Sequence, residues 1–146
     1  MRSARSAIAL SSAALLALAG ATVASAAGGR PYMTELEGEQ ERPVIGDLDG
    51  TGHAWITVNA GLGEVCYELH VRGIAPAAAA HIHRAPAGEP GPVVVPLAAP
   101  TGGTSSGCAA VSRDLALDLL RDPEAFYVNV HNADFPGGAL RGQLSR

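Results

Sequence analysis

Hydrophobic and polar residues alternate along much of this chain, and the alternation predicts short β-strands. The pattern is clearest in residues 64–72, where odd-numbered positions are apolar up to Val71 and even-numbered positions include Cys66 and His70. Residues 53–59 alternate in the same way, so the two segments are expected to pair as a hairpin. The other predicted strands are shorter and lie at residues 32–38, 93–97, 108–111, 126–131 and 140–144.

One short helix is predicted among the strands. Leu115 and Leu119 recur at helical spacing after Ser112, the expected N-cap, and Pro123 limits the far end. Residues 100–107 are rich in Gly, Ser and Thr and are predicted to be a flexible loop. The 18 glycines and 10 prolines make up about a fifth of the chain and rule out a long helical bundle. We therefore expect an all-β fold, a Greek-key β-sandwich or small barrel with one short helical insertion.

The start of the chain has the pattern of a signal peptide. Two arginines precede an apolar run at residues 7–19, and small residues at 24–26 fit a cleavage site. The apolar run is too short for a membrane span, and no later segment is long enough. We expect residues 1–26 to be a signal peptide and residues 27–146 to be one domain without a transmembrane segment. The mature protein is then extracellular or associated with the cell envelope.

Charge and cysteine content narrow the classes of function. The formal net charge is −4 and every basic residue is an arginine, so no nucleic-acid-binding surface is expected. The two cysteines, Cys66 and Cys108, are too few for a zinc finger or a cysteine-ligated cluster. In an exported protein they are expected to form a disulfide, which stabilises the fold by about 4 kcal/mol in the chain-entropy model. A redox role is the alternative for this pair.

Several blocks of residues, taken in order, carry a resemblance to a known family. They are Leu36-Glu37-Gly38, Glu41-Arg42-Pro43, residues 50–54, His81-Ile82-His83, residues 91–95, residues 127–131 and residues 135–144. Together they resemble the CHRD domain, which is named for chordin and is widespread in bacterial secreted proteins. The resemblance covers nearly all of residues 27–146 and implies an extracellular all-β module with no established reaction. We therefore expect a non-enzymatic binding or structural module whose partner is an unidentified extracellular protein or envelope component.

The sharpest chemical feature is a histidine pair on one face of an extended segment. His81 and His83 point the same way, and His131 lies on the non-core face of its own predicted strand. If the two strands are neighbours, three imidazoles converge, which suits Cu or Zn with one position left open. Asp134 or Glu89 is a candidate further ligand or outer hydrogen-bond acceptor. This predicts, as the alternative function, a copper- or zinc-binding protein linked to redox stress.

A metal-free explanation of the same histidines stays open. The three histidines and Asn129 are also expected to form a hydrogen-bonded polar cluster if no metal binds. His53 and His70 each stand alone in their local patterns. Arg141 and Gln143 are expected to be exposed to solvent or paired with acidic groups. The aromatic residues are expected to contribute to packing; they are Trp55, Tyr67, Phe126 and Tyr127.

Enzymatic activity is not expected. Cu/Zn superoxide dismutase is likewise a Greek-key sandwich with a His-x-His pair, a later strand histidine and one disulfide. This chain lacks the histidine-rich loop that would supply a bridging imidazole and a zinc site, which leaves dismutase activity as a weak alternative.

Overall fold

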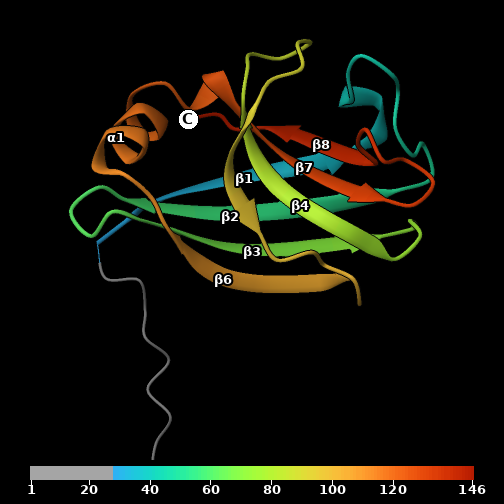
Figure 1. Ribbon diagram of the computed structural model, residues 1–146, viewed down its shortest axis with the longest axis horizontal. Coiled ribbons are helices and arrows are strands. Elements are labelled where there is room, and N and C mark those ends of the chain that lie inside the picture. Colours follow the sequence, from blue (N-terminus) through green and yellow to red (C-terminus); the bar gives the residue numbers. More distant parts are fainter. Residues whose placement is uncertain (1–27) are drawn as a thin grey trace, which may run out of the picture.

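The computed structural model describes residues 28–146, so the predicted signal peptide at residues 1–26 lies outside the described residues. The described part forms eight strands, one α-helix and two short 3-10 helices (Figure 1). In chain order these are β1 (Arg30–Glu37), η1 (Gly38–Gln40), β2 (Thr51–Asn59), β3 (Glu64–Arg72), β4 (Ala77–Arg84), β5 (Val93–Leu97), β6 (Thr104–Ala110), α1 (Arg113–Arg121), η2 (Pro123–Ala125), β7 (Phe126–Asn132) and β8 (Leu140–Gln143).

The eight strands form one antiparallel sheet in the order β5-β4-β7-β8-β1-β2-β3-β6. The sheet curls until its two edge strands approach each other, and side chains rather than a strand ladder link the edges. The Tyr67 hydroxyl accepts a 2.9 Å hydrogen bond from the Ala98 amide, and the Ser105 hydroxyl donates a 2.7 Å bond to the Ala98 carbonyl. The all-β fold is confirmed, and it takes the form of a nearly closed barrel.

Strand alternation places the core inside the barrel. On β2, Ala54, Ile56 and Val58 are buried, and Leu69 and Val65 face them from β3. These are the faces that the sequence pattern predicts. Trp55 lies on the opposite face of β2, as the alternation predicts, and is 45% exposed.

The single α-helix, α1, follows β6 and precedes β7 along the chain. In space it lies at one end of the strands (Figure 1). The Ser112 hydroxyl accepts a 3.1 Å hydrogen bond from the Leu115 amide, so Ser112 is the N-cap as predicted. Leu119 is fully buried against the core, and Pro123 begins the short helix η2 directly afterwards.

The loop predicted at residues 100–107 is wrong in its second half, because strand β6 begins at Thr104. Its residues are mostly small, and the sequence therefore carries no strong strand pattern there. Pairing with β3 supplies the order: Gly107 lies opposite Tyr67, and a Cβ at Gly107 would come within 2.9 Å of the Tyr67 hydroxyl. The tyrosine ring therefore covers the glycine and protects a weak edge strand.

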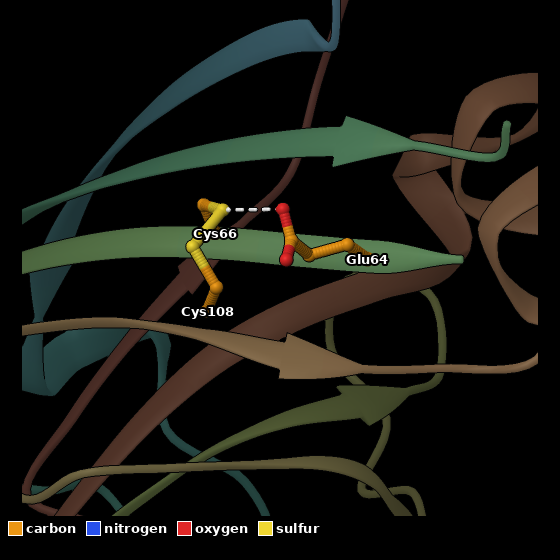
Figure 2. Close-up of a disulfide and its surroundings, with 3 residues drawn as sticks. All are labelled: Glu64, Cys66 and Cys108. Atoms are coloured by element: carbon orange, nitrogen blue, oxygen red, sulfur yellow. Dashed lines mark hydrogen bonds between the residues drawn. A yellow bond between two sulfur atoms is a disulfide. The ribbon is translucent and has the colours of Figure 1, made fainter. Parts of the chain in front are cut away.

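The predicted disulfide between Cys66 and Cys108 is confirmed. The two cysteines lie directly opposite each other on β3 and β6, and the S–S distance is 2.10 Å. Figure 2 shows that the bond crosses the outer face of these strands beside Glu64, whose carboxylate oxygen lies 3.2 Å from the Cys66 sulfur. The bond joins an edge strand to the rest of the sheet.

Candidate metal centre

Three histidines from two neighbouring strands meet on the outer face of the barrel. Strands β4 and β7 pair antiparallel, and alternation turns His81 and His83 outward while Ile82 enters the core. The His81 ring centroid lies 5.5 Å from that of His83 and 5.1 Å from that of His131. One ring nitrogen from each histidine lies within 4.8 Å of the other two. The structure thus brings together the three residues that the sequence singled out.

Backbone carbonyls hold two of these rings in defined orientations. His83 Nδ1 lies 2.8 Å from the Gly91 carbonyl, and His131 Nδ1 lies 3.1 Å from the Pro136 carbonyl. Because a carbonyl only accepts, each Nδ1 carries the proton in the neutral ring and each Nε2 carries a lone pair. His81 Nδ1 lies 3.2 Å from His131 Nε2 and therefore donates to it.

One of these lone pairs has no partner. His83 is 8% exposed, and its Nε2 is buried without a hydrogen-bond partner in the part of the chain that the structure describes. A buried polar atom without a partner costs free energy, so such atoms are rare in folded proteins and call for an explanation. An imidazole nitrogen in this state is available to coordinate a cation.

The surroundings also keep the three rings neutral. Burial lowers the pKa of His81, His83 and His131, and unfavourable interactions between the rings lower it further at His81 and His131. The carbonyl bonds at His83 and His131 oppose this effect without reversing it. Neutral imidazole is the form that binds a metal.

The other proposed members of the site are not part of this group. Among residues 28–146, no carboxylate oxygen lies within 4.8 Å of all three clustered ring nitrogens. Neither Asp134 nor Glu89 is therefore a ligand in this geometry. Asn129 lies opposite His81 on β7, but its side-chain amide donates a 3.2 Å hydrogen bond to Glu41. The hydrogen-bonded cluster expected for the metal-free alternative is therefore reduced to the single bond between His81 and His131.

The segment between β4 and β5 explains why two other expectations are wrong. Residues 85–92 fold back over the outer face of the sheet, and Arg141 is only 1% exposed beneath them. Its guanidinium donates to the carbonyls of Pro86 and Glu89 at 2.9 and 2.8 Å and covers the Tyr127 ring at 3.5 Å. Gln143 donates to backbone carbonyls as well, including that of Ala85 at 2.9 Å. Neither side chain is simply exposed or paired with an acid.

Sequence reasoning also missed a buried acid beside this layer. Glu41 is 1% exposed, and burial raises the pKa of its carboxyl group to about 7, although Asn129 and Arg141 act to lower it. In the sequence Glu41 follows three other acidic residues at alternate positions, and nothing in that pattern distinguishes it from an exposed edge residue.

The two remaining histidines do not stand alone as expected. His53 and His70 lie directly opposite each other on β2 and β3, and both contact the Trp55 ring, at 5.9 and 5.4 Å between centroids. His70 Nε2 lies 2.6 Å from the Glu68 carboxylate. In the described part of the chain these residues do not form a cluster of three donors within 4.8 Å. They line or border shallow surface hollows, the larger about 270 Å³ in volume.

A second group of potential donors, Glu64 with Cys66 and Cys108, is not a metal site. The sulfurs are bonded to each other, and a disulfide offers no thiolate for coordination.

The fold and this site define a small all-β barrel domain that carries one disulfide and an outward-facing cluster of three histidines. The family model of the CHRD domain matches residues 32–144, and the chain therefore belongs to the CHRD domain family. No curated protein and no solved structure matches the chain. None of the helices in residues 28–146 has the length and apolar character that crossing a membrane requires.

Proposed function

We propose that this protein is a secreted, non-enzymatic extracellular module that binds one copper or zinc ion through His81, His83 and His131. The observation that carries the proposal is the buried Nε2 of His83, which has no protein partner in residues 28–146 and lies among two further imidazoles. Three neutral nitrogen donors are a common ligand set for copper and zinc. A fourth position is left for water or for a group from a partner protein.

The outer hydrogen bonds support a ligand role for these rings. Metal-binding histidines usually donate their second nitrogen to a carbonyl or carboxylate, which fixes the tautomer and the ring orientation. The carbonyls of Gly91 and Pro136 occupy this position for His83 and His131. His81 donates to His131, and coordination through His81 Nδ1 requires its proton to move to Nε2.

Secretion is supported by three independent features. The apolar pattern of residues 1–26 has the order of a signal peptide, the disulfide suits an oxidising compartment, and the CHRD family is typically extracellular. The mass of the exported protein tests this part of the proposal. We expect a chain that lacks residues 1–26 and has no free thiol; a full-length chain or two free thiols would contradict it.

Metal content of untagged protein tests the site itself. We expect one equivalent of copper or zinc per chain, lost in the double variant His81→Ala/His83→Ala. The matched control is His53→Ala/His70→Ala, which removes two histidines from the opposite half of the sheet and should keep the metal. If the original chain binds no copper or zinc at micromolar concentration and its melting temperature does not change, the metal-binding proposal is wrong. Equal losses in both double variants would contradict the assignment to this cluster.

A further inference from the structure

We propose that Tyr127 is the positioning residue of the histidine cluster: it holds His83 as the Nδ1–H tautomer, with the Nε2 lone pair facing His81 and His131. The importance of this lone pair for metal binding rests on the function proposed above. The positioning itself is a property of the metal-free protein and is argued from contacts around a single side chain.

The first contact is between rings. The Tyr127 and His83 rings are stacked at an interplanar angle of 12° with 4.9 Å between centroids. Strand β7 lies between β4 and β8, so His83 and Arg141 approach Tyr127 from opposite sides. The Arg141 guanidinium lies 3.5 Å from the ring centroid and has 1% exposure. The tyrosine is therefore held between two neighbours and fixes the plane of the histidine ring.

The second contact runs through the backbone of Gly91. The Tyr127 hydroxyl accepts a 3.1 Å hydrogen bond from the Gly91 amide, and the Gly91 carbonyl accepts the 2.8 Å bond from His83 Nδ1. Tyr127 therefore contacts His83 in two ways, directly through the stacked ring and indirectly through its hydroxyl and the backbone of Gly91. We call these contacts among Tyr127, Gly91 and His83 the Tyr127 circuit. A change at the hydroxyl is thus transmitted to the proton on His83.

Gly91 has little freedom to move in this arrangement. A Cβ at this position would lie 2.1 Å from the Arg84 carbonyl oxygen, so the loop backbone passes too close to β4 for any side chain. The Arg84 amide bonds to the neighbouring Pro92 carbonyl at 3.0 Å. The two peptide units that meet at Gly91 are therefore held by β4 on one side and by the Tyr127 hydroxyl on the other.

The Tyr127 circuit determines which nitrogen of His83 carries the proton and which carries the lone pair. A neutral imidazole that is not constrained populates both tautomers, and one of them places a proton on Nε2 and blocks coordination there. The Gly91 carbonyl selects the other tautomer, provided that it stays within reach of Nδ1. Removal of the hydroxyl releases the Gly91 amide and weakens this selection, while the ring stack is retained.

The variant Tyr127→Phe isolates the hydroxyl, and Tyr67→Phe is its matched control. The Tyr67 hydroxyl also accepts a backbone amide bond, from Ala98 at 2.9 Å, but this bond links β3 to the residue after β5 and does not involve Gly91. Nitrogen-15 NMR of the metal-free protein reports the tautomer of each histidine. We expect His83 to be the Nδ1–H tautomer in the original chain and in Tyr67→Phe, and a mixture in Tyr127→Phe.

A measurement on the original chain alone can overturn the inference, so the test does not depend on whether the variant folds. An Nε2–H tautomer of His83 in the metal-free original chain would overturn the inference. An unchanged His83 tautomer in folded Tyr127→Phe would overturn it too.

Metal titration separates this inference from the proposed function. We expect Tyr127→Phe to bind copper up to about tenfold more weakly and with an altered Cu(II) absorption spectrum. Loss of a ligand's direct hydrogen-bond partner weakens metal binding by about 10- to 100-fold. The Tyr127 hydroxyl acts through that partner, the Gly91 carbonyl, so its effect should lie at the lower end. Tyr67→Phe should match the original chain in both respects. If the original chain binds no metal, the proposed function fails, and the NMR result still decides whether Tyr127 positions His83. If it binds metal and both variants bind equally well, the positioning role is wrong.

Discussion

Glu41 and Asn129 form a buried acid–amide pair in which two oxygen atoms lack partners. The Asn129 amide nitrogen donates to one carboxylate oxygen of Glu41. The other carboxylate oxygen and the Asn129 carbonyl oxygen are buried and have no hydrogen-bond partner within residues 28–146. Both are acceptors while Glu41 is ionised. A proton on Glu41 would turn its unpaired oxygen from an acceptor into a donor and remove the cost of burying a charge.

The substitution Glu41→Gln is expected to remove a specific pH dependence of stability. The folded-state pKa of Glu41 is about 7, above the ordinary 4.5, so its favourable contribution is complete below pH 4.5 and is lost as pH rises through about 7. The full shift corresponds to about 3 kcal/mol. Relative to the original chain, Glu41→Gln should therefore gain stability between pH 4.5 and 8. Urea unfolding across this range measures the difference.

Two comparisons make that measurement specific. Glu39 is an exposed acid two residues away, and Glu39→Gln should show no such gain. The three clustered histidines act in the opposite direction: their lowered pKa values mean that stability is lost as pH falls below their ordinary 6.5. Because all three chains share these histidines, the histidine effect cancels in the difference. If the difference in unfolding free energy between Glu41→Gln and the original chain does not change with pH, the raised pKa of Glu41 is contradicted.

Residue patterns predicted the members of the histidine cluster but not the buried layer beside it. Alternation is sufficient to place His81 and His83 on one face, because it depends only on neighbours along the chain. Arg141 and Glu41 have the same polar, alternating context as exposed residues. They are buried because segments distant in sequence fold over them, and no local pattern encodes that.

At the scale of elements, prediction succeeded where a strand has one face in the core and one in water. Strands β2 and β3 have this contrast along most of their length. Strand β6 does not, because its residues are small, four of its seven positions are exposed and none is fully buried. It is a strand because β3, the disulfide and the Tyr67 ring order it, and these are tertiary interactions.

Reduction of the disulfide should therefore act first on β6. Opening the bond between Cys66 and Cys108, 42 residues apart, is expected to lower the unfolding free energy by up to about 4 kcal/mol in the chain-entropy model. Because β6 is an edge strand paired only with β3, its amides should exchange hydrogen faster than those of β1 and β2. Hydrogen exchange with and without a reducing agent measures this.

The control for reduction is the double variant Cys66→Ala/Cys108→Ala. It should reproduce the reduced state and show no further change when the reducing agent is added. Equal acceleration of exchange in β1, β2 and β6 would contradict a local role of the disulfide, and would indicate that it stabilises the sheet as a whole.

At the scale of the whole molecule, the decisive unknown in the sequence was which strands are neighbours. His81 and His131 are 50 residues apart, and the segment between them contains two strands and the helix. Alternation gives each strand a face but says nothing about its partner. The candidate site depends on the pairing of β4 with β7, which follows from the strand order of the sheet and not from any local pattern.

That arrangement divides the barrel into two halves that should respond differently to metal. The histidines belong to β4 and β7, and their outer hydrogen bonds extend to the loops at Gly91 and Pro136. A bound ion would join these four segments. Strands β3 and β6 lie at the other end of the sheet order, where the disulfide already joins them.

Zinc should therefore stabilise the protein and slow exchange mainly in one half. At a free zinc concentration of about 100 times Kd, linkage predicts about 2.7 kcal/mol of added stability. For a domain of this size, that raises Tm by roughly 10 °C. Amides of β4, β7 and the two loops should gain protection beyond this global increase, and those of β3 and β6 should not. The His81→Ala/His83→Ala variant should lose both effects, whereas His53→Ala/His70→Ala should keep them. Extra protection centred on β2 and β3 instead would move the metal to the His53 and His70 pair and contradict the assignment to β4 and β7.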